Sequence, residues 1–165
     1  MSPVTIITYD EKYKTQIGQL IVHIQNIEFN VPITLNDQPD LADIPGVYQK
    51  DNGNFWLAIV DGVLVGTIGM IGIGNKQACI RKMFVHKDYR GSVLSIAQSL
   101  LDTLLEWAKS KQMRSIYLGT IERLYAARRF YEKNGFRLID PSLLPMAFPR
   151  MKVDTHFYTI TLPPG

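Results

Sequence analysis

The fold is decided where a predicted strand gives way to a helix, in residues 84–97, FVHKDYRGSVLSIA. Residues 77–85, which lead into this junction, predict a strand. After it, apolar side chains recur every three to four residues to about Lys111, which predicts an amphipathic helix. Residues 115–120 then predict a second strand. A strand, a helix and a further strand in this order form a parallel pair with a right-handed crossover.

The segments on either side of this unit complete a mixed sheet. We expect strands over Val4 to Thr8, 55–60 and 63–73, the last two joined by a hairpin turn at Asp61-Gly62. Apolar spacing near 3.6 predicts one helix from about Glu11 to Phe29. The end of the chain predicts a helix through 124–133 that stops at Asn134-Gly135, then strands over 136–139 and 153–162. This order predicts an α/β protein with helices on the faces of its sheet.

Composition narrows the class of protein. The 165 residues, 46% hydrophobic and 20% charged, suit a single globular domain over residues 1–165. One cysteine excludes an internal disulfide and a Cys-x-x-Cys site, and without a His-Glu-x-x-His motif we expect no metal. With no secretory leader and no apolar run near roughly 18 residues, we expect a cytoplasmic protein without membrane contact. A net charge of +3 without a basic cluster argues against nucleic acid as a partner.

The loop at the strand-to-helix junction has features that are typical of an anion-binding site. The first turn of a helix leaves backbone N–H groups unpaired and carries partial positive charge, which suits a phosphate or pyrophosphate. Ser92 or Ser95 could contact such a group or cap the helix. On the residues alone, an anion-binding loop and an ordinary capped turn both remain open.

Two motifs together resemble the GNAT superfamily of acyl-CoA-dependent N-acetyltransferases. Tyr89-Arg90-Gly91 before an apolar helix is similar to the pyrophosphate motif of that family, Arg/Gln-x-x-Gly-x-Gly/Ala. Residues 130–136, FYEKNGF, resemble its signature of a helix that ends in Gly before a strand that begins with Phe. The resemblance implies a mixed, mostly antiparallel sheet of six to seven strands with a parallel central pair, flanked by about four helices.

The resemblance also assigns residues to acetyl-CoA, the cosubstrate that it implies. Strand residues Met83, Phe84 and Val85 would pair with the pantetheine arm and polarise the acyl carbonyl through a backbone N–H. Arg128 either contacts the 3′-phosphate of the nucleotide or lies on a solvated helix face. The loop that would hold the pyrophosphate comprises Arg90, Gly91, Ser92, Val93, Leu94, Ser95 and Ile96.

Three positions depart from the family pattern. Val93 stands where the family usually has Gly, and Ser95 stands at the last Gly/Ala position. A β-branched valine resists both the close approach of a ligand and a positive φ. Leu124 replaces an asparagine that often contacts the pantetheine arm. These departures keep open a catalytically weak GNAT-fold module that binds CoA or regulates another protein.

The catalytic assignments follow from aminolysis of a thioester. Tyr131 matches the family's proton donor to the departing thiolate, and its free pKa of about 10 suits donation near neutral pH. A base would help to neutralise the incoming amine. Glu122, after the strand over 115–120, and Glu28, at the end of the first helix, are the candidates.

The resemblance implies acetyl transfer from acetyl-CoA to a primary amine of a small molecule or peptide, by direct attack in a ternary complex. The acceptor would be covered by residues 30–48, a proline-rich segment that contains Asp37, Asp40 and Asp43. Three acids facing the cleft would favour a cationic acceptor, but the same residues could instead cap short helices. The long final strand offers an edge through which two copies could pair as a homodimer.

Overall fold

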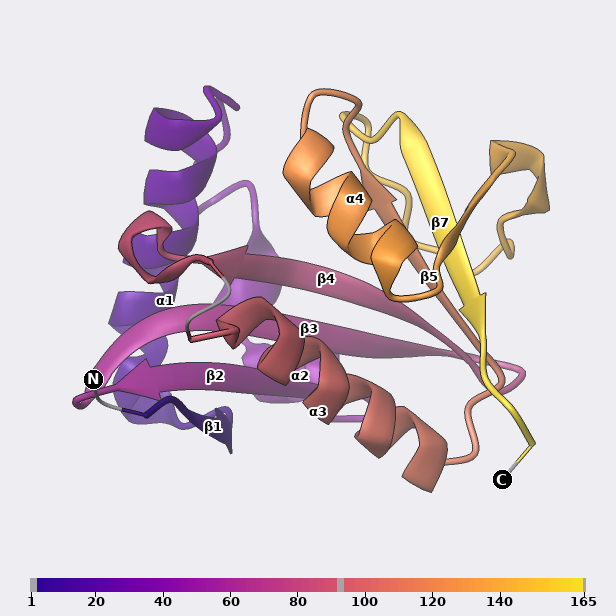
Figure 1. Cartoon of the computed structure of the whole chain (residues 1–165), viewed down its shortest axis with the longest axis horizontal. Helices are drawn as coiled ribbons and strands as arrows, with labels where there is room; N and C mark the ends of the chain where they lie inside the picture. The colour runs from indigo at the N-terminus through magenta and orange to yellow at the C-terminus, as the bar shows by residue number, and fades with distance from the viewer. Residues whose placement is uncertain (1–2, 92–93, 165) are drawn as a thin grey trace.

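The computed structural model describes residues 3–91 and 94–164. Its seven strands form one sheet in the order β1-β2-β3-β4-β5-β7-β6 (Figure 1). β4 and β5 are the parallel pair, and the other neighbours are antiparallel, as the sequence predicts. The strands are β1 (Thr5–Thr8), β2 (Asn54–Val60), β3 (Val63–Gly74), β4 (Gln77–Val85), β5 (Ser115–Thr120), β6 (Arg137–Ile139) and β7 (His156–Thr161).

Four α-helices cover the two faces of the sheet. They are α1 (Lys14–His23), α2 (Ile44–Tyr48), α3 (Ile96–Ser110) and α4 (Tyr125–Lys133). α3 and α4 contribute to the hydrophobic core on one face, whereas α1 and α2 pack in the core on the other. Single 3₁₀ turns lie at Glu11–Tyr13, Pro39–Ala42, Lys87–Tyr89 and Pro141–Leu143. In the part of the chain that is described, none of the helices is long and apolar enough to cross a bilayer.

The first helix is not the single α-helix that the apolar spacing predicts. After α1 the chain continues as a π-helical segment, Ile24–Glu28, in which the Phe29 N–H bonds to the Ile24 carbonyl at 3.1 Å. The side-chain amide of Asn26 donates to the carbonyls of Val22 and Ile33 and thereby ties the wider turn to the following loop. A π-helical turn is rare and often marks a functional site.

A bulge in β4 shapes the centre of the sheet. Thr67 pairs with Phe84 and Gly69 pairs with Arg81, so Lys82 and the residue after it face a single residue of β3. Lys82 has a φ of 55°, and its carbonyl accepts a hydrogen bond of 2.6 Å from the Thr67 hydroxyl. Such bulges bend a strand and re-aim its side chains.

β4 and β5 pair along only one end. Their register runs from Gln77 opposite Ser115 to Cys79 opposite Tyr117, and no later residue of β4 has a partner on β5. Beyond this point the two strands diverge, as Figure 1 shows. The backbone edge of β4 is therefore free to face a ligand in the space between them.

Candidate active site

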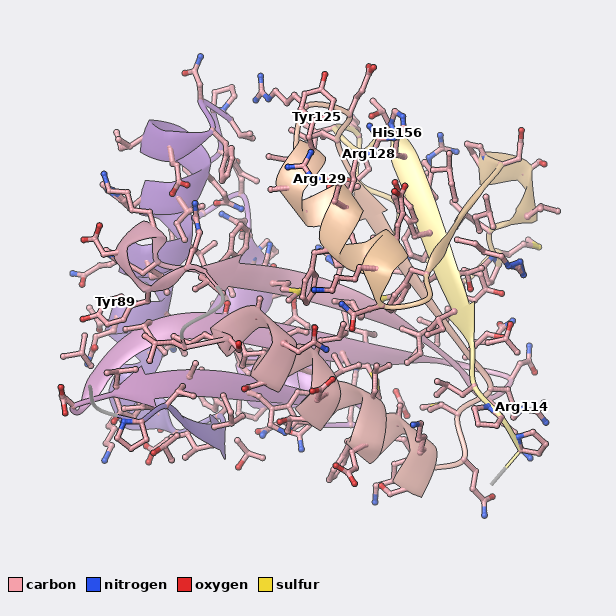
Figure 2. The ribbon with its side chains drawn as sticks, in the orientation of Figure 1. Tyr89, Arg114, Tyr125, Arg128, Arg129 and His156 are labelled. Carbon is pink, nitrogen blue, oxygen red and sulfur yellow. The ribbon has the colours of Figure 1, made fainter. Side chains whose placement is uncertain are left out.

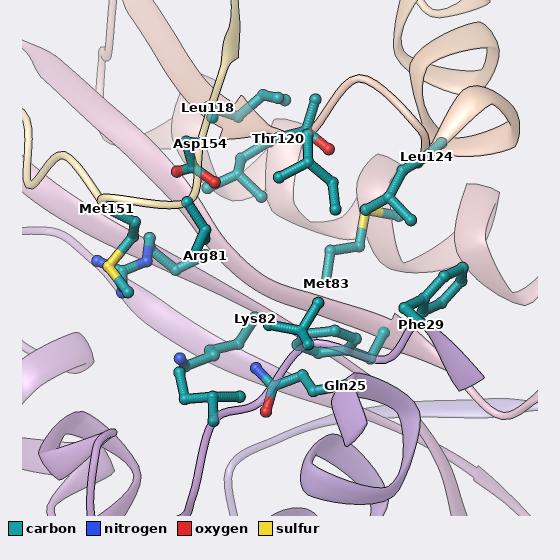
Figure 3. Close-up of a pocket in the computed structure, with 18 of the residues that line it drawn as sticks. Gln25, Phe29, Arg81, Lys82, Met83, Leu118, Thr120, Leu124, Met151 and Asp154 are labelled. Atoms are coloured by element: carbon teal, nitrogen blue, oxygen red, sulfur yellow. The ribbon is translucent and has the colours of Figure 1, made fainter. Parts of the chain in front are cut away.

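A pocket of about 210 Å³ opens where β4 and β5 separate (Figure 3). Its walls come from both strands, from α4, from the π-helical segment and from the loop before β7. Apolar side chains, among them Phe29, Met83 and Leu124, line one end, whereas Arg81 and Asp154 lie together at the other. The pocket thus has an apolar half and a charged half.

Asp154 is the carboxylate that lines this pocket, and sequence reasoning missed it. It precedes β7, in a connection without a recognisable motif, so no local signal marks it. Burial raises the pKa of the Asp154 carboxyl to about 6, although the nearby charges of Arg81, Lys82 and Arg150 oppose the rise. A carboxylate with such a pKa can accept a proton near neutral pH.

Lys82 anchors the proline-rich segment to the bulge of β4. Its buried ammonium donates to Gln38 Oε1 at 2.7 Å and lies 3.7 Å from Asp40. Burial lowers the Lys82 pKa to about 8, although Asp40 opposes the shift. Gln38 also exchanges hydrogen bonds with the side-chain amide of Gln25, which lines the pocket. This network holds the segment over residues 30–48 against the sheet.

The three acids of that segment are not among the residues that line the pocket, which disfavours the first of the two alternatives, in which they face the cleft. Asp43 accepts the Gly46 N–H at 3.0 Å and caps α2, as the alternative interpretation holds. Asp37 closes a turn by accepting hydrogen bonds from the backbone and hydroxyl of Thr34. Asp40 accepts a hydrogen bond of 2.5 Å from Tyr48 and pairs with Lys82. Asp40 is thus paired with a cation of the fold, and Asp37 and Asp43 accept hydrogen bonds from their own segment.

Tyr131 lies in the wall of the pocket, where the FYEKNGF resemblance leads us to expect a proton donor. Its side chain is buried, and its hydroxyl lies 3.7 Å from Met83 Sδ. Burial, reinforced by the charge of Asp154, raises the pKa of the Tyr131 hydroxyl to about 12. The hydroxyl therefore keeps its proton throughout the neutral range. The helix ends as the motif predicts, with Gly135 at a φ of 92°.

The residues assigned to the cofactor flank the pocket on the β4 side. Met83 and Phe84 line it, and Val85 is buried beside them and accepts a hydrogen bond of 2.8 Å from Arg90 Nε. In the loop that follows, Gly91 has a φ of 112°, Leu94 is partly buried, and Ile96 begins α3 in the core. Ser92 and Val93, which the resemblance also assigns to the cofactor, lie outside the described residues.

Ser95 occupies the N-cap position of α3 in a left-handed conformation, with a φ of 52°. Its side chain makes no capping hydrogen bond to the helix, so a side-chain cap, one of the alternatives that the sequence leaves open, is not formed by this residue. The family pattern has Gly or Ala here, and the left-handed region is the one that glycine adopts most readily. Ser95 thus holds a backbone conformation that glycine adopts most readily.

The two glutamates that the sequence suggests as bases lie away from the pocket lining. Glu28 grips the guanidinium of Arg90 through both carboxylate oxygens, and its Oε2 lies 2.9 Å from Nη2. Glu122 is exposed on the β5–α4 loop, in a shallow hollow beside Arg123 and Tyr125. Glu28 therefore ties the predicted cofactor loop to the π-helical segment.

The two positions assigned on α4 differ in their orientation. Leu124 lies at the start of the helix and lines the pocket. Arg128 is on the outside of α4 (Figure 2), where its guanidinium donates to the Tyr158 hydroxyl at 3.0 Å and to the Glu122 carbonyl at 3.1 Å. Among the described residues, no group of three or more His, Cys, Asp or Glu side chains could hold a metal ion.

Comparison with known proteins agrees with this architecture. The sequence model of the acetyltransferase (GNAT) family matches residues 19–136. The crystal structure of a GNAT-family acetyltransferase from Staphylococcus aureus Mu50 is 42% identical, with a TM-score of 0.93 over 97% of this chain and 99% of that one. PaiA N-acetyltransferase of Thermoplasma acidophilum, solved with coenzyme A, has the same fold at 15% identity, with a TM-score of 0.74 over 98% of this chain and 100% of that one.

The chain spans only part of the length of the curated relatives that it matches. N-acetylaspartate synthetase of Xenopus tropicalis is 36% identical over 100 residues, which are 59% of this chain and 36% of that protein. N-acetyltransferase family 8 member 2 of Rattus norvegicus is 28% identical over 131 residues, and the chain covers 57% of it. The match of the family model and the Staphylococcus aureus structure both extend over most of the chain. Together with the diverging parallel strands, they show that the chain belongs to the acetyltransferase (GNAT) family.

Proposed function

We propose that the protein transfers an acetyl group from acetyl-CoA to the primary amine of a small molecule, by direct attack in a ternary complex. The pocket between the diverging ends of β4 and β5 carries this proposal, because it joins an unpaired strand edge to a buried tyrosine. Coenzyme A in the structure of the Thermoplasma acidophilum PaiA enzyme, which has the same fold, supports the choice of cosubstrate. The pocket volume of about 210 Å³ suits a small acceptor better than a folded protein surface.

The strand edge provides the means to hold and polarise a thioester. Residues of β4 beyond Cys79 have no partner on β5, so their backbone groups can pair with the amides of an extended arm, as an added strand would. A backbone N–H on this edge can also donate to the acyl oxygen as negative charge develops on it. Met83, Phe84 and Leu124 give that half of the pocket an apolar lining.

The loop before α3 would hold the phosphates of the cosubstrate. Gly91 has a positive φ, and Ser95 turns the chain directly into the first turn of α3. That turn carries unpaired N–H groups and partial positive charge. The link from Glu28 to Arg90 keeps the loop close to the π-helical segment, so cosubstrate and acceptor would share a fixed frame.

Tyr131 would supply the proton for the leaving group. A neutral amine attacks the acetyl carbon, a C–N bond forms, the C–S bond of the thioester breaks, and the nitrogen gives up one proton to solvent. The thiolate then takes the proton of the Tyr131 hydroxyl, which its buried position keeps protonated near neutral pH. Solvent returns a proton to the tyrosine after product release.

Calorimetry and a thiol-release assay test the proposal. We expect micromolar or tighter binding of acetyl-CoA, and release of free CoA when a suitable amine is added. Tyr131→Phe should retain binding and reduce kcat by about 100-fold, since general acid catalysis typically contributes this much. Tyr125→Phe is the matched control, because Tyr125 is exposed on the same helix. Absence of acetyl-CoA binding would reject the proposal, and binding without thiol release from any amine would favour a non-catalytic CoA-binding module.

A further inference from the structure

The charged half of the pocket contains one strong cation without a carboxylate partner. Arg81 is half-buried in the pocket wall, and its guanidinium donates to Met151 Sδ at 3.4 Å. Among the described residues, no carboxylate lies within 4.0 Å of that guanidinium. A thioether sulfur is a weak acceptor. An incoming anion could therefore replace it at little cost.

The other charges near the pocket are already engaged. Lys82 is committed to Gln38 and Asp40, and the acids of the proline-rich segment bind groups within the fold. The pocket therefore presents two unmatched groups to a substrate, the Arg81 guanidinium and the Asp154 carboxylate. Figure 3 shows both residues at the same end of the pocket, with the Arg81 guanidinium beside Met151.

We propose that the acceptor is a small amino acid or similar compound with a primary amine and a carboxylate, and that Arg81 binds its carboxylate while Asp154 receives a proton from its amine. This inference rests on the proposed acetyl transfer and names the substrate class of the same pocket. The planar guanidinium suits a carboxylate because it offers two parallel N–H donors. A diamine would instead bring a second positive charge next to Arg81.

The proton balance of the step is complete with these groups. The acceptor enters as an ammonium and loses one proton to Asp154, which leaves the lone pair free to attack. The positive charges of Arg81 and Lys82 favour this neutral form of the amine. When the C–N bond forms, the nitrogen loses its second proton through Asp154 to solvent. The departing sulfur takes one proton from Tyr131, so each turnover releases one proton.

Matched acceptors and one substitution test the inference. We would compare β-alanine with β-alaninamide and L-aspartate with its diamide, pairs that differ only in the carboxylate, and include putrescine as a dication. We expect kcat/KM to be at least about 10-fold higher for the carboxylate of each pair. Arg81→Gln should raise KM for the carboxylate acceptor about 10- to 100-fold, remove the preference over the amide, and leave KM for acetyl-CoA unchanged. Arg114→Gln, at the exposed end of the molecule far from the pocket (Figure 2), is the control that should alter none of these values.

The outcomes separate this inference from the proposed function. Efficient acetylation of the amides or of putrescine, or an unchanged carboxylate preference in Arg81→Gln, would overturn the inference and leave acetyl transfer in place. A protein that fails to bind acetyl-CoA, or that releases no thiol with any of these amines, would remove the proposed function and this inference with it. Asp154→Asn should lower kcat for the carboxylate acceptors at least 10-fold without changing acetyl-CoA binding, and an unchanged kcat would reject Asp154 as the proton acceptor.

Discussion

The carboxylate of Asp154 lies against the Cα of Gly119, in the space that a side chain at this position of β5 would need. A Cβ added to Gly119 would lie 2.4 Å from Asp154 Oδ2. The absence of a side chain on β5 therefore lets the loop before β7 deliver a carboxylate into the pocket. The position of the Asp154 carboxylate therefore depends on Gly119, a residue of a separate segment.

Gly119→Ala should displace Asp154 and lower the rate of acetyl transfer by at least about 10-fold, because the carboxylate must move away from the added methyl group. We expect the free energy of unfolding to fall by about 1–3 kcal/mol, as is usual when a packed site receives an extra carbon. Thiol-release kinetics and urea denaturation measure the two effects. In an Asp154→Asn background the same substitution should cost little further activity, and a full additional loss would show that Gly119 acts on something other than Asp154.

The activity should depend on pH through Asp154. Because its carboxyl has a pKa of about 6 and must be ionised to accept a proton, kcat/KM should rise from acid pH and level off above about pH 7. The Tyr131 hydroxyl, with a pKa of about 12, stays protonated over this range and adds no second transition near neutrality. A pH profile of thiol release, compared with that of Asp154→Asn, checks the assignment. Persistence of the same acid limb in the variant would assign it to another group.

Asp154→Asn should make the protein more stable at neutral pH. The folded-state pKa of about 6 exceeds the ordinary value of 3.8, so ionisation of Asp154 costs stability as the pH rises from about 4 to 6. Solvent access limits this cost to about 1–2 kcal/mol, below the full value for a shift of this size. Urea denaturation should therefore show a stabilised variant at pH 7.5, with the difference shrinking toward pH 4. Glu106→Gln, on the exposed face of α3, is the control.

Glu28→Gln and Glu122→Gln test the bases that the sequence suggests. We expect each to keep kcat within about threefold of the parent, because Glu28 is held by Arg90 and Glu122 is exposed outside the pocket lining. Glu28→Gln should also lower the free energy of unfolding by no more than about 1 kcal/mol, as is usual for a partly exposed ion pair. Steady-state kinetics with a saturating acceptor provide the check. A drop of 100-fold in kcat for either variant would restore that glutamate as the base.

Local pattern was enough to predict most of the fold. The hairpin at Asp61-Gly62 has positive φ at both residues, as its sequence predicts, because few residues other than Asn, Asp and Gly adopt that turn easily. The apolar stripe of α3 likewise expresses a periodicity among neighbours in sequence. The π-helical turn at Ile24–Glu28 escaped prediction because its apolar spacing still resembles that of an α-helix.

The sequence likewise predicted some residues of the candidate site and missed others. The FYEKNGF motif placed Tyr131 at a helix end, and the structure finds that residue in the pocket wall. No motif near Asp154 or Arg81 in the sequence marks either residue. Of the acids that the sequence suggested for binding the acceptor, Asp43 caps a helix and Asp40 pairs with Lys82.

The sequence by itself thus determined the order of strands and helices along the chain, the family resemblance and the choice of Tyr131 as a site residue. Each of these depends on periodicity or on a short motif. Only the tertiary structure decided the polarity of the pocket. The bulge at Lys82, the separation of β4 from β5 and the missing side chain at Gly119 bring Arg81 and Asp154 to one end of it. Their meeting depends on strand register and on close packing between distant segments, which no local pattern of residues encodes.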